Sequence, residues 1–167
     1  PIHWEDRMWK IRRRINANDV LRITLCSIGR TQTSYLKEGI AIYLDRLKHY
    51  GKVEWVELPD VAQKGLSKEQ LKQKEGELIL RQLKSEDELY LLDEAGKSLS
   101  SRAFAEWLQK RMNAGTKSIV FQIGGAFGFS DDVYARAQGK ISFSAMTFSH
   151  EMIRLLLVEQ LYRGFTI

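Results

Sequence analysis

The strongest constraint on the fold is an alternation, repeated along the chain, between short apolar runs and stretches with apolar residues every three or four positions. The first run, residues 21–28, is rich in β-branched residues and ends at Gly29, which predicts a strand buried on both faces. Residues 34–50 show helical spacing before Gly51, which predicts an amphipathic helix that ends at a glycine. Strands separated by helices with short connections favour an α/β fold, a mostly parallel sheet with helices on both faces.

The same alternation continues to the end of the chain. Ser67 is followed three residues later by Gln70, a capping box that predicts the start of a helix. We expect further strands and helices in turn at 52–58, 67–83, 88–92, 100–113, 118–123, 130–138, 140–145 and 150–164.

Residues 21–167 are expected to form a single domain, and residues 1–20 an N-terminal extension outside it. In open α/β sheets, ligands bind at the carboxyl ends of the strands. The loops after Leu92, Ile123 and Ile141 are therefore where a functional site is expected.

Composition excludes several classes of protein. Cys26 is the only cysteine, so a secreted disulfide scaffold is excluded. One cysteine and three scattered histidines do not provide the ligand spacing of a structural zinc site, which is excluded too. No apolar run reaches the roughly 18 residues of a membrane span, so we expect a soluble cytoplasmic protein without membrane or metal. With 26 Lys and Arg against 21 Asp and Glu, the net charge of +5 permits a nucleic-acid partner but does not require one.

The glycine-rich segment Gly124–Gly128 directly follows an expected strand. It is neither a G-x-G-x-x-G fingerprint nor a P-loop, which disfavours a dinucleotide-dependent dehydrogenase and an ATPase. Three glycines in five residues let the backbone approach a ligand closely, which suits a nucleoside-like ligand without a phosphate chain. An ordinary tight turn between strand and helix explains the same residues.

A second candidate segment combines small hydroxyl residues with apolar ones at 142–148. The expected change from strand to helix would expose backbone groups that can pair with the edges of an adenine. The alternative is an ordinary strand end with Ser149 or Thr147 capping the last helix. His150 is either a general base or a plain first-turn residue, and Asp93 with Glu94 either pair with a cationic ligand or are solvated.

The final helix is apolar on nearly all sides, because six of the seven residues from Met152 to Val158 are apolar. A surface helix usually needs only one apolar stripe. We therefore expect this helix to be buried against a second surface, most simply a partner subunit in a two-fold dimer. A central core helix within one chain is the alternative.

Five blocks together carry a family resemblance. LRITLCSIGR, LYLLDEAGK, IGGAFG, SFSAMTF and VEQLYRGF occur in that order within residues 21–167, and this region resembles the RlmH family of SPOUT methyltransferases. The resemblance implies an α/β knot, a homodimer, S-adenosyl-L-methionine as cofactor, and methylation of N3 of a pseudouridine in 23S rRNA of the ribosome. A non-catalytic RNA-binding or ribosome-assembly module with the same fold is the alternative. The residues implied to contact the cofactor are Leu92, Gly124, Phe143, Ser144, Ala145, Met146, Thr147 and Phe148.

The resemblance does not identify the catalytic residue. His150 and Arg154 are candidates because they lie close to the cofactor stretch. Two features depart from the family pattern: Ser149 replaces the usual proline before the histidine, and the family's tail with Tyr and His has no counterpart after Ile167. Without such a tail, we expect cofactor binding to survive better than substrate binding. The candidate phosphate contacts are Lys97, Arg102, Lys110, Arg111 and Lys117.

Overall fold

The computed structural model describes residues 20–167, so the expected extension at 1–20 lies outside the described residues except for Val20. The centre of the fold is a five-stranded sheet in the order β2-β1-β4-β3-β5, in which every neighbouring pair is parallel. This confirms the expected α/β class. The strands are β1 (Arg22–Ile28), β2 (Lys52–Leu58), β3 (Asp87–Ser98), β4 (Ser118–Ile123) and β5 (Gly139–Ser142).

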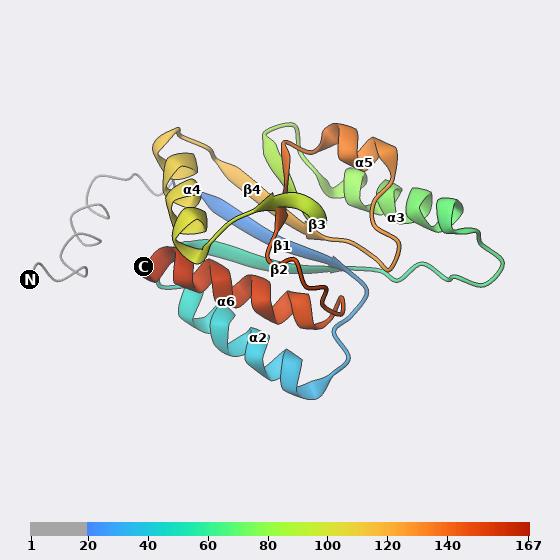
Figure 1. Ribbon diagram of the computed structural model, residues 1–167, viewed down its shortest axis with the longest axis horizontal. Helices are drawn as coiled ribbons and strands as arrows, with labels where there is room; N and C mark the ends of the chain where they lie inside the picture. Colours follow the sequence, from blue (N-terminus) through green and yellow to red (C-terminus); the bar gives the residue numbers. More distant parts are fainter. Residues whose placement is uncertain (1–19) are drawn as a thin grey trace, which may run out of the picture.

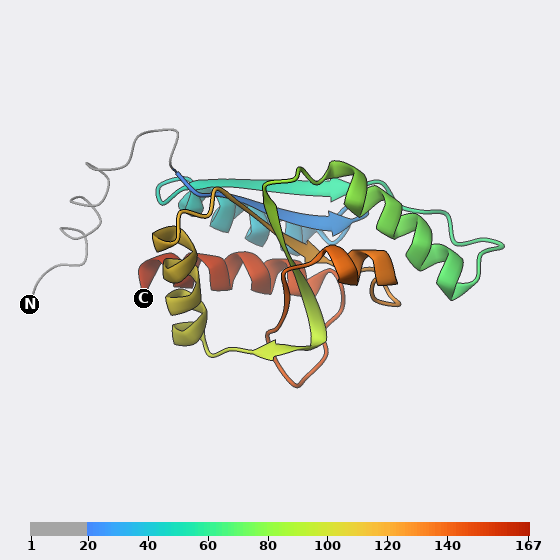
Figure 2. The ribbon, with the colours of Figure 1, turned by 90° about the horizontal axis from the view of Figure 1, so that it is seen from above.

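Helices cover both faces of this sheet, as Figures 1 and 2 show. On one face lie α2 (Ser34–Leu47), α4 (Ser101–Asn113) and α6 (Met152–Thr166), and on the other lie α3 (Lys68–Gln82) and α5 (Asp131–Arg136). Successive side chains of a strand point to opposite faces. Ile23 and Leu25 of β1 accordingly join the first core, whereas Cys26 and Ile28 join the second.

Serine caps begin three of the helices. Ser67 accepts a hydrogen bond from the backbone N–H of Gln70 at 3.2 Å, and the Gln70 side chain accepts one from the N–H of Ser67 at 2.9 Å. This reciprocal pair confirms the predicted capping box. Ser100 and Ser130 accept in the same way at the starts of α4 and α5.

β3 does not end at Leu92 as expected but continues to Ser98, with a shift of register between Leu92 and Lys97. Its second half pairs again with the end of β5, because Lys97 lies opposite Ile141. Gly96 is required here, since a Cβ at this position would lie 2.7 Å from the Ile141 backbone. The segment expected as a free loop is thus an arch of strand that closes over β5.

Three further elements are shorter than expected. α2 ends at Leu47 instead of Tyr50, because residues 48–50 form turns in which the N–H groups of Tyr50 and Gly51 both donate to the Leu47 carbonyl. β5 ends at Ser142 instead of residue 145, because local hydrogen bonds replace sheet pairing: the Ser142 hydroxyl donates to the Ser144 carbonyl at 3.0 Å, and the Ser144 hydroxyl accepts from the Met146 N–H at 2.9 Å. α5 ends at Arg136 instead of residue 138, since the Gln138 N–H donates to Leu89 of β3.

After β5 the chain crosses the sheet from the side of α5 to the opposite face, where α6 packs between α2 and α4 (Figure 1). This crossing takes the chain past the second half of β3, which pairs with Ile141 and Ser142 at the end of β5. Leu157, Val158 and Leu161 of α6 are fully buried in the core of this chain. On the face that carries these three residues, α6 is therefore a core helix within one chain, the second of the two expectations. No helix within residues 20–167 is long and apolar enough to cross a membrane.

Candidate functional site

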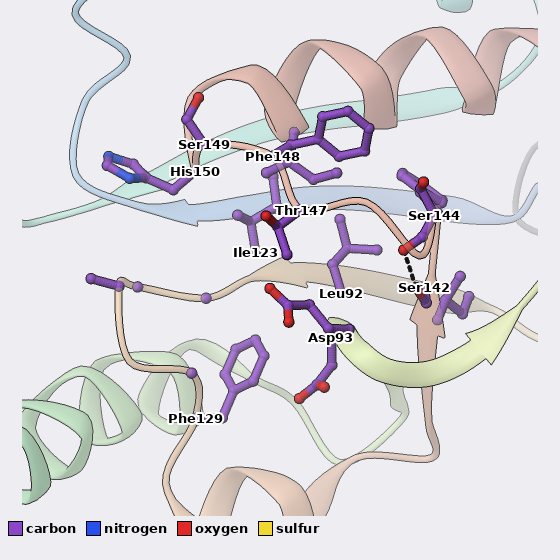
Figure 3. A pocket seen from close by; sticks show the side chains of 18 of the residues that line it. Leu92, Asp93, Ile123, Phe129, Ser142, Ser144, Thr147, Phe148, Ser149 and His150 are labelled. Carbon is purple, nitrogen blue, oxygen red and sulfur yellow. Dashed lines mark hydrogen bonds between the residues drawn. The ribbon is translucent and has the colours of Figure 1, made fainter.

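A cavity of about 610 Å³ lies at the carboxyl ends of β4 and β5 and beside the middle of β3, within the range typical of small-molecule sites (Figure 3). The loops expected after Ile123 and Ile141 meet around it, whereas the expected loop after Leu92 contributes residues 92–94 as part of strand β3. Its lining consists of residues 92–94, 123–129, 141–144 and 146–150, together with Tyr134 and Ile153. Of the expected cofactor contacts, only Ala145 does not line this cavity.

The glycine segment after β4 forms one wall, in which three glycines lie beside Ala126 and Phe127. A Cβ on Gly124 would lie 3.0 Å from the Phe129 ring, and one on Gly125 would lie 2.5 Å from the Glu75 carboxylate. Gly128 has φ of +83°, a conformation that side chains other than glycine rarely adopt. The glycines are therefore needed both for the turn and for the close approach of backbone to the cavity.

The segment after β5 forms the opposite wall. Its bends are fixed by the hydrogen bond from Ser142 to Ser144, drawn in Figure 3, and by that from Met146 to Ser144. Phe148 and Met146 are 43% and 76% exposed, so large apolar side chains remain at the rim. The Ser149 hydroxyl accepts from the Met152 N–H at 3.1 Å and so stabilises the turn before α6, whose own N-cap residue is Glu151.

The charged lining of the cavity is acidic. Asp93 and Glu94 line it from β3, and none of its described lining residues is Lys or Arg. Asp93 accepts from the Ala95 N–H at 2.8 Å and from the hydroxyl of Tyr134 on α5. Burial, together with the hydrogen bond to Asp93, raises the pKa of Tyr134 to about 12, so this hydroxyl stays protonated. The cavity is suited to a cationic ligand and lacks the cations that usually hold phosphate.

Arg154 does not face this cavity, so its interpretation as a catalytic candidate is wrong. Its side chain is 1% exposed and donates to the carbonyls of Ile28 and Gly29 at 2.8 and 2.9 Å. It also pairs with Glu57 at 3.2 Å and donates to the carbonyl of His150 at 3.2 Å. Arg154 therefore ties the start of α6 to the end of β1, while His150 itself lies at the exposed edge of the cavity.

The structure adds lining residues that sequence reasoning missed, namely Phe129, Tyr134 and Ile153. Tyr134 lies within the helix that follows the glycine segment, and nothing in its spacing indicated a partner on β3. Two of the candidate phosphate contacts lie at the amino-terminal ends of the strands, away from the cavity. Arg111 pairs with Glu88 at 3.5 Å near the start of β3, and Lys117 directly precedes β4.

Within the described part of the chain, no three His, Cys, Asp or Glu side chains are grouped so that they could hold a metal ion.

Comparison with known proteins gives a consistent set of relatives. A family model described as a predicted SPOUT methyltransferase matches residues 21–167. A protein of Flavobacterium johnsoniae named ribosomal RNA large subunit methyltransferase H is 53% identical over 148 residues, which are 88% of this chain and 94% of the relative. Proteins of the same name from Cytophaga hutchinsonii and Bacteroides fragilis are 48% and 45% identical, again over 88% of this chain and over 95% and 94% of their own lengths.

Proposed function

The chain belongs to the SPOUT methyltransferase family, and we propose that it transfers a methyl group from S-adenosyl-L-methionine to N3 of a pseudouridine in 23S ribosomal RNA. The relatives that match it over most of its length are named as methyltransferases of large-subunit ribosomal RNA. The observation that carries the proposal is the meeting of the loops after β4 and β5 with residues 92–94 of β3 around one cavity.

The residues of this cavity fit the proposed cofactor. Gly124 leaves a backbone cradle that a Cβ would fill against the Phe129 ring, so a flat ligand can lie close to the chain. Leu92, Ile123 and Ile153 supply apolar walls. Asp93 and Glu94 suit the positive charge of a sulfonium and an amino group. The proposed cofactor contacts are Leu92, Gly124 and the segment 143–148, in which every residue except Ala145 lines the cavity.

When bound, the cofactor supplies an electrophilic methyl group to the acceptor nitrogen. The task of the protein is then mainly to hold the two reactants in line, because orientation alone can remove a large part of the barrier. The acceptor nitrogen carries a proton that must leave, and a positioned base accelerates such a transfer. We propose that His150 accepts this proton, because it lines the exposed edge of the cavity through which an RNA base would enter.

The proposed enzyme is a homodimer. Leu156 of α6 is partly exposed and belongs to neither core cluster of the described residues. On the neighbouring helix α2, Tyr35 and Ile42 are 63% and 50% exposed. Large apolar side chains on adjacent helices indicate a surface that a second copy of the chain can cover.

Two measurements test the proposed function. Isothermal titration of the folded protein with S-adenosyl-L-methionine should give saturable binding. Ribosomes from a strain that lacks the native modification should then incorporate labelled methyl groups when protein and cofactor are added. Folded protein that binds no cofactor would refute the proposal, and binding without methyl transfer would favour the non-catalytic alternative.

A further inference from the structure

Tyr134 connects two elements of the cavity that are distant in the sequence. It projects from α5, and its ring packs edge-on against Phe129 with centroids 5.7 Å apart and an interplanar angle of 83°. Its hydroxyl donates to Asp93 on β3, and Lys140 lies 5.4 Å from its ring centroid. Nothing in the proposed methyl transfer requires this connection.

Two hydrogen bonds orient the Asp93 carboxylate, and neither of them comes from a cation. One carboxylate oxygen accepts from the Ala95 N–H at 2.8 Å, and the other accepts from Tyr134. Both donors are uncharged, and Asp93 forms no ion pair with any residue in the described region. Because the raised pKa keeps Tyr134 protonated, the donor persists at neutral pH. A partly buried carboxylate is therefore held at the cavity by two uncharged donors, with no cation paired to it among the described residues.

Glu94, the next residue of β3, provides a contrast. It also lines the cavity, but its side chain is exposed. Among residues 20–167 it forms neither a hydrogen bond nor an ion pair. Water and salt screen an exposed, freely rotating charge far more than one that is partly buried and fixed. The two neighbouring carboxylates should thus differ in their effect on a charged ligand.

We propose that Asp93, oriented by Tyr134, makes the cavity discriminate by charge, so that it binds the cationic methyl donor more tightly than the neutral thioether product. This inference rests on the proposed function. Transfer of the methyl group removes the positive charge of the sulfonium, and S-adenosylhomocysteine has one positive charge less than the donor. A fixed negative charge in the cavity favours the first molecule over the second and so promotes exchange of product for fresh donor. Asp93 is the specificity-determining residue, and Tyr134 is its positioning residue.

The test is a ratio of two dissociation constants, measured by calorimetry at low ionic strength for S-adenosyl-L-methionine and S-adenosylhomocysteine. Asp93→Asn keeps the shape and an oxygen that can accept from Tyr134, but it removes the charge. We expect this variant to weaken binding of the donor about tenfold while binding of the product stays nearly constant. An unchanged ratio, or equal weakening of both ligands, would overturn the inference, because a purely structural role affects both alike.

Two further variants make the test specific. Tyr134→Phe keeps the ring on Phe129 and frees Asp93, so the ratio should move in the same direction by about threefold. Glu94→Gln removes the same charge from the exposed neighbour and should change the ratio less than about twofold. If Asp93→Asn does not fold, the Tyr134→Phe ratio decides alone. Wild-type protein that binds neither ligand refutes the proposed function itself, whereas binding of both with ratios insensitive to Asp93 refutes only this inference.

Discussion

Replacing Arg154 by Met should destabilise the fold more than any change at an exposed charge. The guanidinium is buried and donates to the carbonyls of Ile28 and Gly29, to the Thr31 hydroxyl and to Glu57. Removing one partner of a buried ion pair costs about 3–5 kcal/mol. Because the Glu57 side chain keeps 27% of its exposure, part of its hydration survives, and we expect the lower end, about 3 kcal/mol.

Urea unfolding followed by circular dichroism measures this loss. With a slope of about 2 kcal/mol per molar urea, Arg154→Met should lower the midpoint by about 1.5 M. Arg163 on the same helix is the matched control, since it forms an exposed pair with Glu159 at 2.5 Å. Arg163→Met should leave the urea midpoint unchanged within error, because an exposed ion pair contributes little to stability.

The double variant Arg154→Met with Glu57→Gln separates the charge pair from the remaining hydrogen bonds. If the pair matters, the double variant loses less stability than the sum of the two single variants, because neither charge is then left without its partner. A loss below about 1 kcal/mol for Arg154→Met, or strict additivity with Glu57→Gln, would refute this reasoning. The His150 carbonyl accepts a hydrogen bond from Arg154. We therefore also expect His150 to become more mobile in the Arg154→Met variant.

Four further predictions follow from single contacts. Gly124→Ala places a methyl group 3.0 Å from the Phe129 ring and should weaken binding of S-adenosyl-L-methionine about tenfold in calorimetry, while overpacking against this ring should lower the urea midpoint by about 0.5 M. Leu156→Glu should convert the proposed dimer to a folded monomer in light scattering, and an unchanged mass would refute the placement of the interface on α6. Burial tends to raise the pKa of Glu57, but hydrogen bonds from Thr31 and the charge of Arg154 lower this pKa overall. The unfolded chain therefore binds more protons than the folded one, and the urea midpoint should fall as the pH drops below 4.5. In Glu57→Gln the midpoint should depend less on pH. Burial raises the pKa of Cys26 to about 11, so a thiol reagent at neutral pH should label it only after unfolding, and rapid labelling of native protein would contradict its position in the core.

The sequence was a good guide where local spacing determines structure. Residues 118–123 form β4 with the expected bounds, and the Ser67 capping box begins α3 as predicted. The location of the cavity also followed from the sequence, because ligands bind at the carboxyl ends of parallel strands. Periodicity failed where long-range contacts decide the structure. Residues 93–98 show no strand pattern, yet they continue β3, and Lys97 and Ser98 pair with Ile141 and Ser142 of β5, more than forty residues away.

Long-range contacts also explain why the sequence indicated the wrong role for Arg154 at the site. Its position beside the cofactor segment suggested chemistry, but its partners Ile28 and Glu57 lie 126 and 97 residues away in the sequence. A single charged residue in an apolar helix is compatible with a catalytic group and with a buried structural one. Only the folded chain shows that its donors are already engaged. Tyr134 was missed for the opposite reason, since a tyrosine on a short helix gives no local signal of a contact with Asp93.

We propose that the cavity between residues 92–94 of β3 and the carboxyl ends of β4 and β5 serves methylation of ribosomal RNA. Mass spectrometry of 23S rRNA fragments, after ribosomes lacking the modification are incubated with the protein and labelled S-adenosyl-L-methionine, is the decisive measurement. We expect one labelled methyl group on N3 of a single pseudouridine, and its loss when Gly124 is replaced by a larger residue. Unmodified rRNA in the presence of folded, cofactor-bound protein would rule out this role.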